Sequence, residues 1–202
     1  MRMRKINYKL KIAIIGKEPK GHDMILNCLT NLTIDNQEES LDSFVFQIMH
    51  KYIPIKIHIK QYETMRTMLS ELDSVNSFDF LFLVLNIYDN DSLNDFEKEL
   101  YEELCSEIHF KGSSLLIALN LKSTKKDFLI NKVRISRHRL IRKCNDLDLE
   151  YCFEIIDPNE DLNDLFKKIL DDSVIKFKIS NPELYEKVKE FGLILSEKVD
   201  KI

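Results

Sequence analysis

Apolar residues recur along the chain in alternating patterns, some typical of strands and others of helices. Short runs of β-branched or continuous apolar residues predict strands over residues 10–15, 44–48, 53–59, 80–85, 115–119 and 151–156. Apolar residues at three- and four-residue spacing predict helices over residues 24–32, 62–72, 91–108, 125–144 and 161–170. The segment over residues 33–43 is polar and acidic, and we expect a loop there.

The order of these elements indicates the fold class. A hairpin joins residues 44–48 to residues 53–59, and every other strand is followed by a helix. Parallel strands need such crossover connections, and the nearly continuous apolar run at 80–85 is typical of a strand that is covered on both faces. The sequence therefore predicts an α/β fold whose six-stranded, mostly parallel sheet contains one antiparallel strand and is flanked by helices.

A further helix signal sets the C-terminus apart. Asn181 and Pro182 are typical of a helix start, because asparagine caps the first amides and proline fits the first helical position. An apolar stripe at helical spacing follows, at Leu184, Val188, Phe191, Leu195 and Val199. Two interpretations stay open: the stripe packs on its own domain, which we favour, or it docks to a partner.

We therefore divide the chain into a domain over residues 1–172 and a C-terminal extension over residues 173–202. A linker is expected over 171–180, and its segment 174–179 is a candidate to extend or brace the sheet. The length of 202 residues suits one buried domain with an appended element. The net charge of −4 disfavours non-specific binding of nucleic acid by the whole chain.

The cysteines and histidines give no metal-site signature. The four cysteines form no C-x-x-C pair, so we expect reduced, mostly buried thiols in preference to a disulfide framework or a zinc site. The histidines are scattered without ligand spacing, which predicts no metal. The first apolar run is too short for a signal peptide or a membrane span. We expect a cytoplasmic protein without a transmembrane segment, at most peripheral to membranes through a partner.

A loop with two glycines separates the first predicted strand from the first helix. Residues 16–23 read G-K-E-P-K-G-H-D, where a phosphate-binding P-loop reads G-x-x-x-x-G-K-[ST]. The glycines have the right separation. However, His22 replaces the phosphate-binding lysine, Asp23 replaces the magnesium-binding hydroxyl residue, and Pro19 has no N–H. Asp23 is expected to satisfy the start of the helix itself and to repel phosphate. A plain strand-to-helix turn stays an alternative.

The layout from about residue 10 to residue 170 resembles the Ras-like small GTPase family. The resemblance rests on the loop at 16–23, the hairpin at 44–59, the strand at 78–85 with its continuation S-L-N-D-F-E at 92–97, Asn120 after a buried strand, and the last helix at 161–166. It implies a Ras-like P-loop fold in which residues 1–172 are the small GTPase-like domain. In that family, the corresponding motifs bind a guanine nucleotide with magnesium.

This sequence departs from the family at each of its main motifs. The family's D-x-x-G is replaced at 59–63 by I-K-Q-Y-E, and its base-reading N-K-x-D by Asn120-Leu121-Lys122-Ser123, in which serine cannot replace the aspartate. The degenerate nucleotide site consists of Gly16, Lys17, Lys20, Gly21, His22, Asp23, Asn120, Lys122 and Ser123.

These losses predict a pseudo-GTPase. Such a protein is catalytically inactive, has no cofactor, and acts as a scaffold or adaptor by binding other proteins. The family resemblance implies a setting beside another GTPase or in an adaptor or trafficking complex. The alternative is a divergent P-loop protein that still binds GTP or GDP with magnesium. Such a protein would use Lys17, Lys20 and His22 for phosphate.

A basic segment and the C-terminal stripe are candidate interaction surfaces. Residues 122–143 are rich in lysine and arginine, and on a helix three arginines and one histidine fall near one another: Arg134, Arg137, His138 and Arg142. One interpretation is a patch for an acidic protein partner, an anionic lipid or nucleic acid, of which nucleic acid is disfavoured because no aromatic side chains are interleaved. The interpretation we favour is a solvated face balanced by the acidic helix at 91–107. The second surface consists of Leu184, Val188, Phe191 and Leu195.

Overall fold

The computed structural model describes residues 8–33, 35–40, 43–71, 78–121 and 133–199. Within these residues, one sheet contains the strands β1 (Tyr8–Ile15), β2 (Asp35–Ser40), β3 (Ser43–His50), β4 (Ile53–Tyr62), β5 (Phe80–Asn86), β6 (Ser113–Leu119) and β7 (Tyr151–Ile155). The helices are α1 (Pro19–Leu32), α2 (Met65–Ser70), α3 (Asn90–Asn94), α4 (Lys98–Glu107), α5 (Arg137–Asp146), α6 (Pro158–Ser180) and α7 (Pro182–Val199). Among the described helices, none is long and apolar enough to cross a bilayer.

The sheet has the order β2-β3-β4-β1-β5-β6-β7. The six predicted strands are β1 and β3 to β7, and β3 is the strand that runs antiparallel to its neighbours. The predicted α/β fold and its mostly parallel sheet are therefore confirmed. The loop predicted over 33–43 was wrong, because β2 adds a strand to the sheet edge beside β3. Its sequence D-N-Q-E-E-S has no apolar residue and so lacks the alternation by which a strand is recognised.

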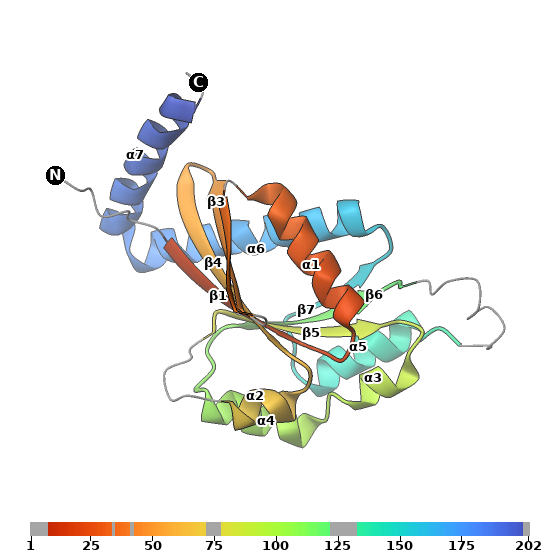
Figure 1. The fold of residues 1–202 in the computed structure, drawn as a ribbon. Helices are drawn as coiled ribbons and strands as arrows, with labels where there is room; N and C mark the ends of the chain where they lie inside the picture. The colour runs from red at the N-terminus through yellow and green to blue at the C-terminus, as the bar shows by residue number, and fades with distance from the viewer. Residues whose placement is uncertain (1–7, 34, 41–42, 72–77, 122–132, 200–202) are drawn as a thin grey trace.

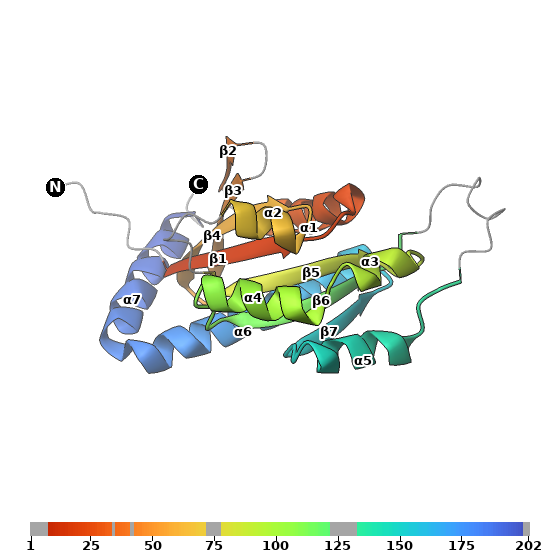
Figure 2. The same cartoon turned by 90° about the horizontal axis from the view of Figure 1, so that it is seen from below.

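Helices cover both faces of the sheet, as Figure 1 shows with the sheet seen edge-on and Figure 2 shows from below. Helices α1 and α6 pack on one face and α2, α3, α4 and α5 on the other. Along β5, Phe80, Phe82 and Val84 belong to the core under α1 and α6. The intervening Leu81, Leu83 and Leu85 belong to the opposite core. Because strand side chains alternate between faces, this double burial explains the continuous apolar run.

Three helix predictions need correction. The single helix predicted over 91–108 is two helices, α3 and α4, because the chain between them buries Phe96 at 2% exposure. Helix α2 begins only at Met65, because β4 continues to Tyr62. The basic helix begins at Arg137, where the Ser136 side chain caps it. Residues 125–132 of that prediction lie outside the described residues.

The C-terminal region also differs from the prediction. Residues 171–180 are the second half of α6, neither a linker nor an added strand, so the proposed boundary between 172 and 173 falls inside this helix, which packs against the sheet. Val174 and Phe177 are buried, and the Phe177 ring stacks on Tyr8 with centroids 4.6 Å apart. Helix α7 then begins at Pro182, as predicted.

Helix α7 packs on its own domain, against β4 and α6. Its most buried side chains are Tyr185 and Val188, at 7% and 1% exposure. Phe191 and Leu195 are half-buried, whereas Leu184 is exposed. The favoured interpretation of packing within the chain is therefore confirmed, but the buried face is rotated away from Leu184 and onto Tyr185.

Candidate functional site

The loop that resembles a P-loop is a short turn between β1 and α1. Because α1 begins at Pro19, only residues 16–18 separate the two elements, and Gly21 lies inside the helix. Neither Gly16 nor Gly21 has a positive φ. A nest of amides around an anion requires alternating right- and left-handed residues. This turn therefore lacks the concave backbone that holds phosphate in a P-loop.

Several backbone groups of this turn already have partners within the chain. The Gly16 amide donates to the Tyr62 carbonyl at 3.0 Å. The amides of Gly21 and His22 donate to the Glu18 carbonyl at 3.0 and 3.2 Å. Pro19 contributes no N–H at the first position of the helix. A bound phosphate would have to compete with these hydrogen bonds.

The two glycines are required by close packing. A Cβ atom on Gly16 would lie 2.2 Å from the Val84 carbonyl oxygen of β5. A Cβ atom on Gly21 would lie 2.5 Å from Cδ1 of Leu119, at the end of β6. Both distances are shorter than van der Waals contact, so each glycine lets the turn lie directly on the sheet. Their P-loop-like spacing thus has a structural cause that involves no ligand.

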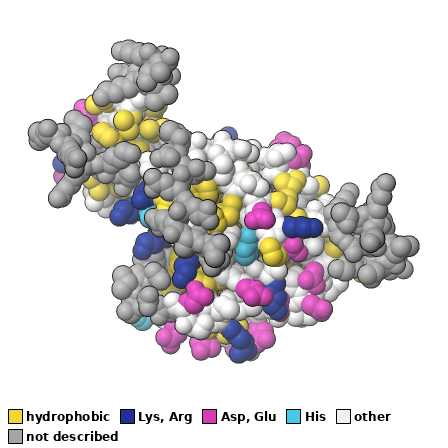
Figure 3. Space-filling view, viewed as in Figure 1, with side chains coloured by type: hydrophobic (Ala, Val, Ile, Leu, Met, Phe, Trp, Pro, Cys, Tyr) yellow, Lys and Arg dark blue, Asp and Glu magenta, His cyan; other side chains and the backbone are white. Residues whose placement is uncertain are grey.

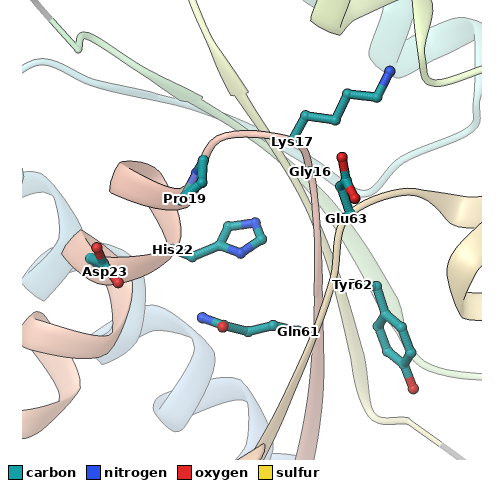
Figure 4. A pocket seen from close by; sticks show the side chains of 8 residues that line it. All are labelled: Gly16, Lys17, Pro19, His22, Asp23, Gln61, Tyr62 and Glu63. Carbon is teal, nitrogen blue, oxygen red and sulfur yellow. The ribbon is translucent and has the colours of Figure 1, made fainter. Parts of the chain in front are cut away.

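The charged residues of the turn point away from a common centre, as Figure 4 shows. Lys17 turns its Nζ to Asp95, 2.8 Å from Oδ1, and this hydrogen bond raises the lysine pKa. Lys20 is exposed. Asp23 is also exposed and is the fifth residue of α1. The expectation that Asp23 satisfies the helix start was wrong, because the helix begins a full turn earlier, after Glu18.

His22 is the buried polar residue of this region. Its side chain is 8% exposed, and burial lowers its pKa, although the nearby Asp23 acts in the opposite direction. Within the described residues, its Nε2 atom has no hydrogen-bond partner. A neutral imidazole therefore occupies the position at which a P-loop carries a permanently charged lysine.

A cavity of about 300 Å³ opens between the turn and the end of β4. It is lined by Gly16, Lys17, Pro19, His22, Asp23, Gln61, Tyr62 and Glu63. The structure thus brings four of the predicted site residues together. Gln61 was not predicted to belong to the site, and its Nε2 is buried without a partner in the described part of the chain. Its position could have indicated its place in the site, because Gln61 lies at the carboxyl end of β4, the strand beside β1.

The rest of the predicted nucleotide site is not assembled around this cavity. Lys20 and Gly21 do not line it. Asn120 follows β6, where its amide donates to the Ile155 carbonyl at 2.9 Å and its buried Oδ1 has no described partner. Lys122 and Ser123 lie outside the described residues. Asp95, which binds Lys17, was not predicted to belong to the site, because it is distant in sequence from the turn.

The candidate basic surface is divided by the start of α5. Arg134 precedes the helix and forms an ion pair with Glu154 of β7, which corrects its predicted place on the helix. Arg137, His138 and Arg142 are exposed on α5. Figure 3 shows several acidic side chains along the lower side, where α2 and α4 lie, and others elsewhere on the same face. Helix α4 contributes exposed Glu99, Glu102, Glu103 and Glu107.

A scan of protein-family models gives no match to this chain, and a search of curated proteins gives none either. Ras-like membership therefore rests on layout alone: an α/β fold, a mixed sheet of compatible strand order, and a loop of P-loop-like spacing.

Proposed function

We propose that this chain is a pseudo-GTPase, that is, a Ras-like scaffold that binds other proteins and neither binds nor hydrolyses GTP. The observation that carries the proposal is the start of α1. There, the amides of Gly21 and His22 already donate to the Glu18 carbonyl, and the Lys17 ammonium is held by Asp95. Two amides and one cation that could bind a polyphosphate are thus engaged within the chain. We place the protein as an adaptor beside an active GTPase or in a trafficking complex.

The charges around the cavity support the absence of nucleotide. Asp23 and Glu63 line it as carboxylates, His22 is held toward its neutral form, and Lys17 is paired with Asp95. A triphosphate would meet more negative than positive charge at short range, and this repulsion is stronger at a half-buried site than in water. Magnesium would relieve it only if a ligand set were present. Within the described residues, no cluster of metal-ligating side chains occurs.

The strand order supports the Ras-like part of the proposal. If β2 is left out and the other six strands are numbered along the chain, the sheet order is 2-3-1-4-5-6. The second and third of these strands, β3 and β4, form a hairpin beside β1. The cavity lies at the carboxyl end of β1, which is the edge where open α/β sheets bind their ligands. The chain has thus kept the position of a ligand site, while the groups present there favour packing within the protein.

The exposed face of α5 is the surface that best suits a protein partner. Arg139 donates to Asn90 and Lys143 to the Phe96 carbonyl, so these cations are used inside the fold. His138 and Arg142, one turn apart, remain exposed. Such a face suits an acidic partner, which charge attraction would steer toward it.

The nucleotide part of the proposal is tested on the purified chain. The protein is denatured, the released small molecules are separated by ion-exchange chromatography, and phosphate release from added GTP is followed with and without magnesium. We expect no guanine nucleotide and no hydrolysis above a blank. One equivalent of guanine nucleotide in the supernatant would contradict the proposal.

The partner-binding part is tested by charge reversal on α5. His138→Glu with Arg142→Glu is compared with Glu99→Lys and Glu103→Lys on α4, since both pairs are exposed. Proteins that co-purify with the tagged chain from its own cells are compared by quantitative mass spectrometry. We expect a set of acidic proteins to be lost with the α5 variant and kept with the α4 variant. Equal retention by both variants would rule out α5 as the docking face.

The alternative, a divergent P-loop protein that still binds GTP or GDP, draws support from one observation. His22 and Gln61 both carry buried nitrogen atoms without described partners, and both line the cavity. Unpaired buried polar groups are costly, and a bound ligand is one way to satisfy them. Titration of the chain with GTP, GDP and ATP distinguishes the two proposals, because only the alternative predicts saturable binding.

A further inference from the structure

Two cysteines from neighbouring elements lie on the same face of the sheet. Cys144 is in the last turn of α5 and is 4% exposed, among the residues packed under α2, α4 and α5. Cys152 is the second residue of β7 and is exposed. Both are free thiols. One is therefore protected inside the domain, while the other is accessible to small reagents.

The strand alternation of β7 turns Cys152 toward α5. Tyr151, Phe153 and Ile155 belong to the core under α1 and α6. The side chains between them must therefore point to the opposite face. Glu154, two residues after Cys152 and so on the same face of β7, forms an ion pair with Arg134 just before α5.

The backbone between the two cysteines turns back immediately after α5. The Leu149 amide donates to the Cys144 carbonyl at 2.9 Å, and the next residue joins β6 through a hydrogen bond from the Glu150 amide to the Ser114 carbonyl. This reversal returns the chain beside its own helix. Cys152 pairs in register with Leu116 of β6, which belongs to the same core as Cys144, and α5 packs on both β6 and β7.

The surroundings make the two thiols unequal. The neighbouring Cys144 thiol lowers the pKa of Cys152, and the Arg137 guanidinium lowers it further, against the effect of burial. The neighbouring Cys152 and burial together raise the pKa of Cys144. Cys152 is therefore the more reactive thiolate and Cys144 the proton donor. Attack on oxidants requires the thiolate form.

We propose that Cys144 and Cys152 are a peroxide-sensitive dithiol that closes to a disulfide between α5 and β7. The Cys152 thiolate attacks one oxygen of hydrogen peroxide, the O–O bond breaks, and hydroxide leaves and takes a proton to become water. Cys152 is now a sulfenic acid. The Cys144 sulfur then attacks Cys152 Sγ, the S–O bond breaks, and the departing hydroxide takes the Cys144 proton. Two thiols are oxidised and one peroxide is reduced to water.

The other cysteines are poor competitors for this reaction. Burial raises the pKa of Cys28 to about 11, and its Sγ lies 3.3 Å from Oδ1 of Asn163. Burial also raises the pKa of Cys105. Because neither is activated as a thiolate, the reaction is selective for the Cys144–Cys152 pair.

The test maps the disulfide on the full chain. Folded protein is treated with hydrogen peroxide, unfolded in N-ethylmaleimide, and digested with trypsin and a glutamate-specific protease. Cleavage after Glu150 separates the two cysteines, so only a disulfide keeps their peptides joined. We expect a joined pair that is released by a dithiol reductant, with maleimide on Cys28 and Cys105. Further oxidation of Cys152 beside a maleimide-labelled Cys144 would overturn the proposal, as would two unlinked labelled peptides.

A charge variant tests the activation independently of the disulfide. Arg137→Gln removes the guanidinium that favours the Cys152 thiolate, and we expect alkylation of Cys152 by iodoacetamide at neutral pH to slow by about threefold. The matched control is Arg142→Gln, which removes an exposed arginine of the same helix and should leave the rate unchanged. Equal rates in the two variants would contradict the assigned activation.

Discussion

At the scale of single residues, His22 most clearly distinguishes this turn from a phosphate site. Its imidazole is buried at 8% exposure, and burial favours the neutral form. A lysine at this position would carry a full positive charge and would require an anion or solvent close by. Histidine can lose its charge at neutral pH, so it can be buried there without a counter-ion. This difference makes the pH dependence of stability informative.

We predict that His22 makes the protein less stable as the pH falls below about 6.5. Its pKa is lowered in the folded chain from the usual 6.5. Between the folded and unfolded pKa values, the unfolded chain binds more protons, so the free energy of unfolding falls with falling pH. Urea unfolding at several pH values should show a shallower dependence for His22→Gln.

The control for this prediction is His138→Gln, at an exposed position on α5. It should keep the pH dependence of the natural chain over the same range. The comparison uses the change with pH and not the absolute stability, because the glutamine side chain has its own packing cost. Identical pH dependence for His22→Gln and the natural chain would contradict the buried neutral histidine.

At the scale of elements, α7 makes one particularly close approach to the domain in addition to its buried side chains. A Cβ atom on Gly192 would lie 1.8 Å from the carbonyl oxygen of Tyr52, in the β3–β4 turn. Tyr52 and the preceding Lys51 have positive φ values of 63° and 48°. The turn that meets α7 is therefore tight. The Tyr52 carbonyl occupies the space that a side chain at position 192 would need.

We predict that Gly192→Ala destabilises the protein by about 1–3 kcal/mol, which is the usual cost of overpacking. Glycine in a helix is normally less favourable than alanine by about 1 kcal/mol, so an effect of this sign requires the contact with Tyr52. Glu190→Ala changes an exposed position on the same helix and should be nearly neutral. Chemical unfolding measures both variants. A more stable Gly192→Ala would show that α7 does not pack on the turn.

The sequence predicted those elements whose own residues determine their form. The burial of β5 on both faces and the start of α7 at Pro182 both follow from local pattern. Strand β2 could not be predicted, because its pairing with β3 comes from backbone hydrogen bonds and its side chains are polar. The full length of α6 was also missed, since Val174 and Phe177 fit a strand pattern as well as a helix until the core is known.

The candidate site was predictable only in part, for a related reason. Gly16 and Gly21 were found from their spacing, but the spacing does not reveal that α1 begins at Pro19. The pairing of Lys17 with Asp95 joins residues far apart in the chain, and no sequence motif records it. Local pattern thus located the turn, whereas the tertiary contacts determine what its groups are free to bind.

At the scale of the whole molecule, the turn at the carboxyl end of β1 has two helix amides and Lys17 engaged by the chain itself. Introducing two P-loop side chains should therefore give little affinity for phosphate. We predict that His22→Lys with Asp23→Ser gains only weak affinity for GTP, because the amides still donate to Glu18 and Lys17 still binds Asp95. Equilibrium dialysis with labelled GTP and magnesium measures the affinity.

Asn27→Lys is the control for the restored variant, since it adds a positive charge at an exposed position of the same helix. Both variants should bind GTP weakly and lose that binding in salt, as expected for screened charge attraction. Micromolar or tighter binding by the restored variant alone would mean that the two side chains were the main obstacle.

The most direct test of the central claim observes the turn itself. Backbone amide resonances of the natural chain are followed by NMR while GDP, GTP or ATP is added with magnesium. If the amides of Gly21 and His22 stay bonded to Glu18, their shifts remain unchanged up to millimolar nucleotide, and their exchange with solvent stays slow. Saturable shifts centred on these amides, with one nucleotide bound per chain, would contradict the account.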